Sequence, residues 1–115
     1  MEELKEPLVS IIMPVYNGER YLEKTISSIC ESQYKNIEIL CIDDCSKDNS
    51  VKICREFARK DARVRVYTRT ENGGVAEARN TGLQICRGNY VCFADQDGIV
   101  SSDFCASMVR DIMEN

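Results

Sequence analysis

The chain has 115 residues, which is enough for one domain with a core and at the lower end of size for an α/β enzyme. Its formal net charge of −4 argues against a basic surface that binds nucleic-acid phosphates, so we expect no nucleic-acid partner. No apolar run approaches the roughly 18 residues of a membrane-spanning helix, and the short charged N-terminus is unlike a signal peptide. We therefore expect a cytoplasmic location, which for a longer protein includes the inner face of the membrane.

Strand-like segments alternate with helical ones along the chain. The expected strands are residues 9–15, 37–42, 64–67 and 89–94. The first is almost continuously apolar, which is typical of a strand buried on both faces of a sheet. Three helices between the strands place small or apolar residues on one face, namely Leu22, Ile26, Ile29 and Cys30, then Val51, Cys54, Phe57 and Ala58, then Val75, Ala78, Gly82 and Cys86.

Polar residues mark where these helices begin. Asn17 is expected to cap the first helix, and the loop of residues 45–50 supplies capping side chains for the second. The third helix is expected over residues 75–87. A fourth is expected to begin at Ser101 or Ser102 and to carry an apolar stripe made of Phe104, Met108 and Ile112.

The alternation of strand and helix predicts the fold class. It indicates βαβ units with right-handed crossovers, and therefore a mainly parallel sheet with helices on both faces. We expect an α/β fold with three layers, α/β/α, built on a Rossmann-like sheet. One domain is expected over residues 8–115, after a short tail of residues 1–7.

Seven cysteines raise the question of disulfides or a zinc site. None forms a CxxC pair and the chain has no histidine, so the usual zinc signatures are missing. Most cysteines stand where the helix or strand pattern favours a small apolar residue. We therefore expect reduced thiols that act mainly as core residues, and they are Cys30, Cys41, Cys45, Cys54, Cys86, Cys92 and Cys105.

Basic residues are densest around the third expected strand. Arg63, Arg65 and Arg69 stand there, and their alternate spacing indicates one face of the strand. We interpret these arginines as a solvated edge of the sheet.

Polar residues gather after the expected strands, at the edge where an open α/β sheet binds its ligands. Asp43 and Asp44 follow the second strand. One is expected to cap the next turn, which leaves the other free to accept a hydrogen bond from a ribose or a base. Tyr16, after the first strand, can stack on that base or simply pack against the sheet.

Asp95 and Asp97 directly follow the fourth expected strand. Two carboxylates at this spacing suit a hard divalent cation that also binds water and substrate phosphates. The same Asp-x-Asp-Gly pattern is equally good chemistry for a tight turn, so both interpretations stay open.

A glycine-rich segment spans residues 72–82. Gly73 and Gly74 allow a sharp turn into the third helix, and Gly82 allows that helix to pack closely. Arg79 is expected to be the cation that opposes the acidic strand ends or a diphosphate. A salt bridge to Glu77 or to an acidic loop is the alternative.

Four segments together resemble the inverting GT-A glycosyltransferases of family 2. They are residues 9–17, 42–48, 72–82 and 88–97, in the family's order and spacing. The resemblance covers nearly the whole chain from residue 8 onward. It implies transfer of a sugar from a nucleoside diphosphate, usually UDP, to a saccharide or lipid-linked acceptor, with inversion at the anomeric carbon.

The resemblance also implies roles for individual residues. The implied donor-binding residues are Pro14, Val15, Tyr16, Asp43, Asp44, Arg79, Asp95 and Gln96. Among them, Asp44 would bond the uracil or ribose, and Gln96 would help to hold the ribose and the sugar. Asp97, with Asp95 beside it, would bind the Mn²⁺ or Mg²⁺ that neutralises the departing diphosphate.

Two departures from the family pattern limit these expectations. Gly98 stands where many relatives have a further aspartate, which leaves a thinner metal site. The family's general base comes from a later segment, so we expect a donor-binding fragment that is nearly inactive alone. The alternative is a non-catalytic module that binds a nucleotide or a nucleotide sugar. The sequence leaves the oligomeric state open.

Overall fold

The computed structural model describes residues 7–98, and this range contains four strands and three helices. In chain order they are β1 (Val9–Val15), α1 (Leu22–Cys30), β2 (Ile37–Asp43), α2 (Ser50–Lys60), β3 (Val64–Thr68), α3 (Gly74–Ile85) and β4 (Tyr90–Phe93). The predicted strands and the third helix are all present, with ends shifted by at most two residues. The fourth predicted helix, Cys105 and residues 1–6 of the tail lie outside the described residues.

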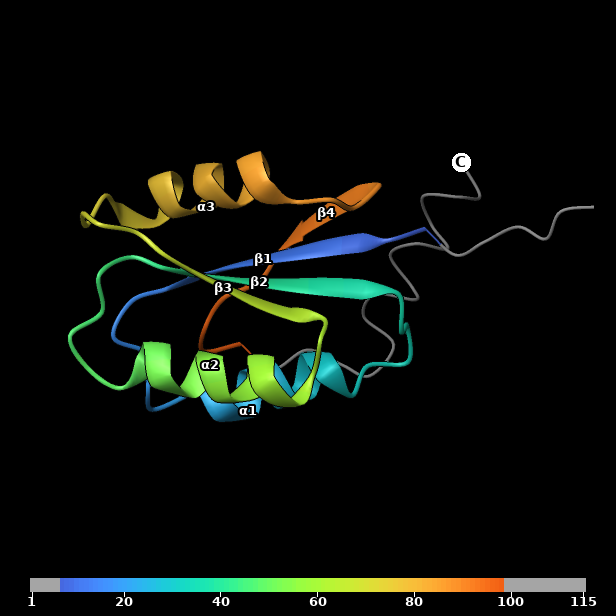
Figure 1. The fold of residues 1–115 in the computed structure, drawn as a ribbon, viewed down its shortest axis with the longest axis horizontal. Coiled ribbons are helices and arrows are strands. Elements are labelled where there is room, and N and C mark those ends of the chain that lie inside the picture. Colours follow the sequence, from blue (N-terminus) through green and yellow to red (C-terminus); the bar gives the residue numbers. More distant parts are fainter. Residues whose placement is uncertain (1–6, 99–115) are drawn as a thin grey trace, which may run out of the picture.

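The four strands form one parallel sheet in the order β3-β2-β1-β4. Helices α1 and α2 cover one face of this sheet and α3 covers the other (Figure 1). The predicted three-layer α/β/α fold is therefore confirmed. The chain moves outward from β1 to β3, and α3 then returns it to the opposite side of β1. The strand order thus reverses between β1 and β4, where this class of fold opens a crevice at the carboxyl ends of its strands.

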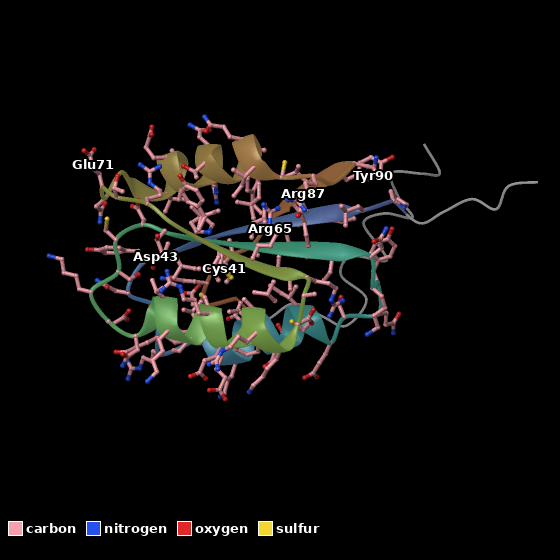
Figure 2. The ribbon with its side chains drawn as sticks, viewed as in Figure 1. Cys41, Asp43, Arg65, Glu71, Arg87 and Tyr90 are labelled. Carbon is pink, nitrogen blue, oxygen red and sulfur yellow. The ribbon has the colours of Figure 1, made fainter. Side chains whose placement is uncertain are left out.

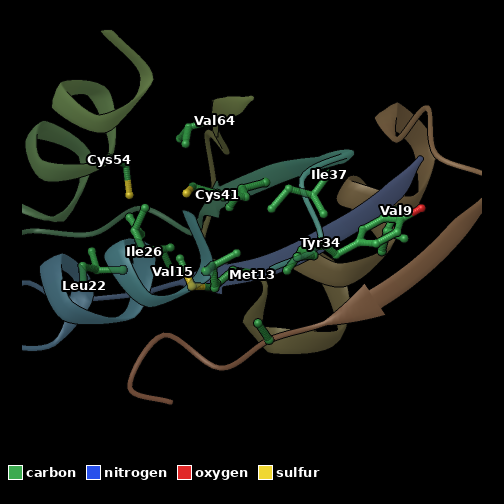
Figure 3. Packing of buried hydrophobic residues seen from close by; sticks show 14 residues of the cluster. Val9, Met13, Val15, Leu22, Ile26, Tyr34, Ile37, Cys41, Cys54 and Val64 are labelled. Atoms are coloured by element: carbon green, nitrogen blue, oxygen red, sulfur yellow. The ribbon is translucent and has the colours of Figure 1, made fainter. Parts of the chain in front are cut away.

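The main core lies between the sheet and helices α1 and α2 (Figure 3). Leu22, Ile26 and Ile29 are fully buried there, as the helical spacing predicts. Cys41 of β2 and Cys54 of α2 are also fully buried, and both are free thiols. A hydrogen bond from Cys54, together with burial, raises the pKa of Cys41 well above its ordinary value. Cys41 therefore stays neutral, and both cysteines pack in the core as small apolar residues.

A smaller core lies on the α3 face of the sheet, where Ile12 meets Ala78. A Cβ atom on Gly82 would lie 2.5 Å from Cγ2 of Ile12, so the missing side chain lets α3 approach β1 closely. This confirms the predicted role of Gly82. Val75 does not join this core, because it is 56% exposed at the start of α3. None of the helices within residues 7–98 is long and apolar enough to cross a membrane.

The predicted capping role of Asn17 is wrong. Helix α1 begins at Leu22, and its N-cap position is Tyr21. Asn17 instead adopts a positive φ of 48°, and its side-chain oxygen accepts a hydrogen bond from the Lys47 N–H at 2.8 Å. Its own N–H donates to the Ser46 hydroxyl, so Asn17 ties the β1–α1 loop to the β2–α2 loop.

The loop before α2 supplies a side chain to the start of that helix, as expected, but the side chain comes from Asp48, because the N-cap residue Asn49 makes no side-chain hydrogen bond to the helix. The Asp48 carboxylate accepts hydrogen bonds from the N–H and the hydroxyl of Ser50, the first residue of α2. Burial alone would raise the pKa of Asp48, but these bonds and one from the Glu19 N–H hold that pKa below its ordinary value.

The sequence suggested that the arginines around β3 form a solvated edge of the sheet. That interpretation is wrong, because each of them forms an ion pair. Arg63 pairs with Asp61, Arg65 with Glu38 and Arg69 with Asp44. The Arg63 guanidinium holds the pKa of Asp61 below its usual range, and it also donates to the Cys30 carbonyl at the end of α1. Sequence spacing could not reveal these pairs because each acidic partner except Asp61 comes from the neighbouring strand β2.

A buried polar cluster around Glu38 closes the end of the sheet opposite the predicted site. Its carboxylate accepts hydrogen bonds from the Ser10 hydroxyl, the Arg87 N–H and Arg65. Burial would raise the pKa of Glu38, but those three bonds together hold it below its ordinary value. Figure 2 shows this end of the molecule near Arg87 and Tyr90, with Asp43 and Glu71 at the other end. The cluster anchors the connection from α3 to β4 and leaves the opposite edge to ligands.

Candidate functional site

A pocket of about 290 Å³ lies at the carboxyl ends of the strands, at the point where the strand order reverses. It collects residues from β1, the end of β2, the start of α3 and the turn after β4. The described residues that line it are Pro14, Val15, Tyr16, Asp44, Asn72, Gly74, Val75, Ala78, Asp95, Gln96 and Asp97. Seven of the nine residues proposed from the sequence are among them. Asp43 and Arg79 are not.

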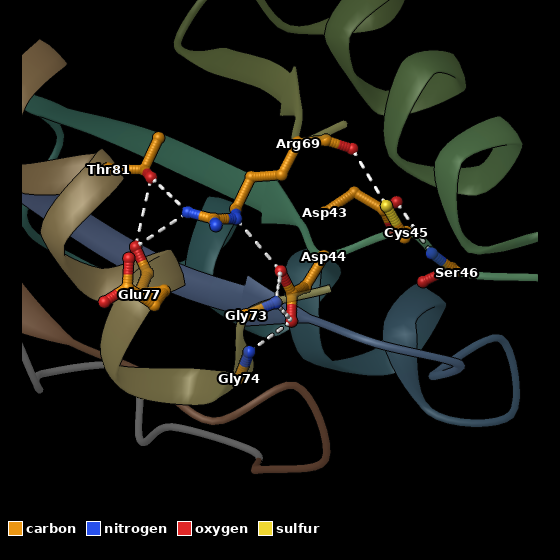
Figure 4. A network of polar contacts seen from close by, with 9 residues as sticks. All are labelled: Asp43, Asp44, Cys45, Ser46, Arg69, Gly73, Gly74, Glu77 and Thr81. Carbon is orange, nitrogen blue, oxygen red and sulfur yellow. Dashed lines mark hydrogen bonds and ion pairs between the residues drawn. The ribbon is translucent and has the colours of Figure 1, made fainter. Parts of the chain in front are cut away.

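Asp44 lies at the end of β2 and is almost completely buried. Its carboxylate accepts hydrogen bonds from the N–H groups of Gly73 and Gly74, the latter at 2.7 Å (Figure 4). Gly73 is the N-cap residue of α3 and, as a glycine, has no side chain to cap the helix, and Gly74 is the first residue of α3. Asp44, which follows β2, therefore caps α3, although α3 comes after β3 in the chain. The positive end of the helix dipole stabilises the negative charge of Asp44.

Arg69 completes the environment of Asp44, and the sequence did not identify it. Its Nε donates to Oδ1 of Asp44 at 3.0 Å, and its Nη1 donates to the Thr81 hydroxyl at 2.8 Å and to the Glu77 carbonyl. One guanidinium thus joins the ends of β2 and β3 to α3 (Figure 4). No sequence signal could have singled Arg69 out, because its partners become neighbours only when β3 pairs with β2.

Arg79, which the sequence suggested as the cation facing the acidic strand ends, has a different position. Its guanidinium lies over the Phe93 ring, 5.1 Å from the ring centre, and its Nε is buried without a hydrogen-bond partner among the described residues. Arg79 is not among the described residues that line the pocket, and the arginine paired with Asp44 is Arg69. Arg69 holds the place that we had assigned to Arg79. The donor-binding role that the resemblance implies for Arg79 stays a prediction.

Asp43 lies on the opposite face of β2 from Asp44. One of its oxygens accepts a hydrogen bond from the Ser46 N–H at 3.0 Å, so Asp43 is the residue of the pair that caps the following turn. Its other oxygen is buried without a hydrogen-bond partner among the described residues. The two adjacent carboxylates therefore point in different directions. Asp43 caps the loop that follows β2, and Asp44 forms part of the pocket wall.

The β3–α3 loop needs its glycines for two different reasons. Gly74 has a positive φ of 89°, which side chains strongly disfavour. A Cβ on Gly73 would lie 2.8 Å from Nη2 of Arg69, so a larger residue would push the guanidinium away from Asp44. This supports the predicted sharp turn and links it to the ion pair.

Asp95 and Asp97 stand on a turn after β4, in which the Gly98 N–H donates to the Asp95 carbonyl at 3.1 Å. The turn interpretation of this segment is therefore correct. Both carboxylates are nevertheless exposed and line the pocket. Within residues 7–98, neither side chain has a hydrogen-bond or ion-pair partner, which leaves both free to bind a ligand.

The free carboxylates fit a magnesium or manganese ion that is shared with a substrate. The described residues contain no cluster of three or more His, Cys, Asp or Glu side chains that could hold a metal by itself. These ions commonly use one or two protein carboxylates and complete their coordination with water and substrate phosphates. The described lining also contains no lysine or arginine, so Asp95 and Asp97 would repel a diphosphate unless a cation lay between them. The donor set is therefore of the right kind.

Gln96 lies between these carboxylates, and its side-chain amide is bonded to the backbone of Tyr16. The Tyr16 N–H donates to Oε1 at 2.8 Å, and Nε2 donates to the Tyr16 carbonyl at 3.0 Å. Tyr16 itself is 42% exposed at the mouth of the pocket, which leaves its ring available for stacking. The sugar-binding role expected of Gln96 stays a prediction.

Comparison with known proteins gives one consistent family. Glycosyl transferase family 2 matches this chain over residues 10–115. The glycosyltransferase GlyA of Streptococcus pneumoniae is 43% identical over 111 residues, which are 96% of this chain and 16% of that protein. The chain thus spans only a fraction of this curated relative.

Solved structures agree with that match. S. aureus TarS residues 1–349 in complex with UDP-GlcNAc has a TM-score of 0.85 and 28% identity, over 92% of this chain and 31% of that one. The mannosyltransferase PcManGT from Pyrobaculum calidifontis, in complex with GDP-Man and Mn²⁺, has a TM-score of 0.81 and 26% identity, over 94% and 32%. Both structures are complexes with a nucleotide sugar.

Proposed function

The chain belongs to glycosyltransferase family 2 and has the GT-A fold, and from this premise we propose that it forms the donor-binding part of a metal-dependent glycosyltransferase. The donor is a UDP-sugar, and the acceptor is a saccharide or a lipid-linked saccharide, to which the sugar passes with inversion. A cytoplasmic location, at the inner face of the membrane for a longer protein, goes with a lipid-linked acceptor. One observation carries the proposal: the pocket joins a helix-capping carboxylate, Asp44, to two free carboxylates, Asp95 and Asp97.

The two ends of this pocket suit the two ends of a nucleotide sugar. Asp44, held by Arg69 and two backbone N–H groups, offers only hydrogen-bond acceptors, which match the N–H donors of a uracil base or the hydroxyls of a ribose. Pro14 and Val15 form the apolar wall beside it, and the Tyr16 ring stacks on the base. A volume of about 290 Å³ is at the lower limit for small-molecule sites and suits a nucleoside rather than the whole donor.

The other end faces the diphosphate and the sugar. Asp95 and Asp97 would hold Mn²⁺ or Mg²⁺, and when bound this ion supplies Lewis-acid stabilisation of the negative charge on the departing UDP. The carboxylates fix where that charge is held, which orients the bond that breaks relative to the base pocket. Arg79, stacked on Phe93, adds positive charge on the α3 side of β4.

Turnover requires a group that deprotonates the acceptor hydroxyl, and we propose no residue of this chain for that step. A missing general base reduces the rate by a factor of roughly 10²–10⁴, before any loss of acceptor positioning. The chain alone is therefore expected to bind the donor and to be nearly inactive. Its relatives are several times longer, which is consistent with an acceptor site that lies outside it.

The decisive experiment combines binding with turnover. UDP is titrated calorimetrically with Mn²⁺ and with a chelator, and release of UDP from a panel of UDP-sugars is then measured for this chain and for the longer protein that contains it. We expect metal-enhanced UDP binding by both and turnover only by the longer protein. Binding without turnover in the longer protein would favour a non-catalytic nucleotide-sugar-binding module. No UDP binding under any condition would contradict both functions.

A further inference from the structure

The pairing between β1 and β4 stops before β1 ends. The last hydrogen bond in this register runs from the Ala94 N–H to the Ile12 carbonyl, at 3.0 Å. In a parallel pair, every second residue of a strand directs its backbone groups to the same neighbouring strand. After Ile12, the next residues on the side of β4 are therefore Pro14 and Tyr16, and Tyr16 directly follows β1. Pro14 has no N–H, and the ladder cannot continue through it. The backbone of Tyr16 is therefore left without a strand partner on that side.

The side chain of Gln96 takes the place of that missing strand. Its amide both accepts from the Tyr16 N–H and donates to the Tyr16 carbonyl, as a peptide group in a neighbouring strand would. Asp95 and Asp97 flank this residue, so the same two bonds hold the acidic turn at a fixed place relative to β1. Pro14 and Asp95, which lie between the last backbone bond and this amide on their two segments, both line the pocket.

Gly18 lies directly against the side chain of Gln96. A Cβ atom at this position would lie 2.4 Å from Oε1 and 2.7 Å from Cδ of Gln96, and its three nearest atoms all belong to that side chain. Gly18 does not have a positive φ, so an alanine there would suffer from this contact and not from backbone strain. The absent side chain of Gly18 is thus matched to the amide of Gln96.

Resting on the proposed function, we propose that Gln96 is a positioning residue. Its amide bridges β1 to the turn after β4 and thereby sets where Asp95 and Asp97 hold the divalent cation, while Gly18 leaves room for that bridge. Gln96 then lines the donor pocket, but its amide is bonded to Tyr16 and makes no hydrogen bond to the ribose or the sugar. The amide acts on the metal only through the two carboxylates beside it.

The test is a double-mutant cycle with Gly18→Ala, Gln96→Ala and the double variant. The measured quantity is the metal enhancement of UDP binding, defined as the ratio of the dissociation constants in chelator and in Mn²⁺, with the thermal midpoint of each variant alongside. Loss of a group that orients metal ligands typically reduces metal affinity about 10- to 100-fold. We expect each single variant to lose about 10-fold of the enhancement, beyond any change that it makes to UDP affinity in chelator.

The double variant distinguishes this bridge from two independent defects. In the Gln96→Ala background, the methyl group added by Gly18→Ala has nothing to displace, so the double variant should match Gln96→Ala and not lose about 100-fold. Losses that multiply would overturn the proposal. Equal weakening of UDP binding in Mn²⁺ and in chelator would also overturn it, because a merely structural defect acts on both.

A conservative change and a surface control complete the design. Gln96→Glu keeps the length and the acceptor but replaces the donor to the Tyr16 carbonyl with a second acceptor, so we expect it to resemble Gln96→Ala. Stronger Mn²⁺ binding by this variant would mean that residue 96 contacts the metal directly, which would overturn the proposal. Gln84→Ala, on the exposed face of α3, should match the wild type. If the wild type binds no UDP at all, the proposed function fails, and the cycle in thermal midpoints still reports whether Gly18 and Gln96 are coupled.

Discussion

Two pairs of carboxylates stand at the same edge of the sheet, and the fold treats them in opposite ways. Asp43 and Asp44, at the end of β2, are only 2% and 3% exposed and are bonded to backbone N–H groups. Asp95 and Asp97, after β4, are exposed and have no partner within residues 7–98. The residue type and the position at a strand end are the same, and only the neighbours differ.

The difference shows how neighbouring strands divide one ligand site. The end of β2 lies in the middle of the sheet, between β1 and β3, where Arg69 and the start of α3 can reach it. The Asp44 carboxylate there is bonded to Arg69 and to the start of α3, so its position is fixed before a ligand binds. The end of β4 lies at the edge of the described sheet, and its charge is left for a cation. A shape-fixing carboxylate and a metal-binding carboxylate can therefore be told apart by their partners.

The largest expected effect comes from removing the charge at the buried pair. Asp44→Asn leaves Arg69 without its ion-pair partner and places an amide against the N–H groups of Gly73 and Gly74. Removing one member of a buried ion pair destabilises a protein by about 3–5 kcal/mol, and we expect a loss near the lower value because Arg69 is 17% exposed. Urea unfolding of the variant and the wild type measures it.

Asp97→Asn is the matched control, with the same chemical change at the exposed pair. It should alter the free energy of unfolding by no more than about 0.5 kcal/mol. Equal losses of stability in the two variants would contradict the division between the pairs.

A smaller free-energy effect is expected on ligand binding at the exposed pair. Asp97→Ala should weaken UDP binding in Mn²⁺ about 10-fold, which corresponds to about 1.4 kcal/mol, because the cation loses a ligand. In chelator the variant should bind UDP at least as tightly as the wild type, because it lacks one of the two carboxylates that repel the diphosphate. Calorimetric titration checks both, and Asp95→Ala serves as the second site in the same assay. Unchanged binding in Mn²⁺ would remove the metal from this turn.

Acid should lower the stability of the fold mainly by protonating carboxylates that are already bonded within the protein, such as Glu38. Because the pKa of folded Glu38 lies below its unfolded value of about 4.5, Glu38 stabilises the protein fully above that pH, and this contribution is lost as pH falls further. Glu38→Gln should therefore cost about 1 kcal/mol at neutral pH and make the fall in stability between pH 5 and pH 3 less steep. Unfolding curves across that range provide the measurement. A slope identical to that of the wild type would contradict the assignment.

The smallest effect is expected at one contact of Arg69. Thr81→Val keeps the shape of the side chain and removes the hydroxyl that accepts from Nη1, while the Glu77 carbonyl still accepts from the same nitrogen. A loss of about 0.5 kcal/mol is expected, since a partly exposed hydrogen bond contributes little when a second acceptor remains. The unfolding free energy tests it. A loss as large as that of Asp44→Asn would mean that Thr81, rather than Asp44, is the main partner of Arg69.

The sequence by itself determined the layers and the edge at which ligands bind. Apolar runs at strand spacing and stripes at helical spacing require only local chemistry, so β1 and the buried face of α1 could be predicted. The carboxyl ends of parallel strands share one edge whatever their order, so Tyr16, Asp44 and the Asp95–Asp97 turn could be brought together in advance.

The tertiary structure alone decided the partners. Which arginine meets Asp44 depends on β3 lying beside β2, whereas the sequence had favoured Arg79 from its place in the glycine-rich segment of residues 72–82. The bond between Gln96 and Tyr16 joins residues that are 80 positions apart, and it depends on where β4 leaves β1. Hydrogen bonds and ion pairs act over about 3 Å, so they follow from strand order and register. A pattern along one chain carries neither.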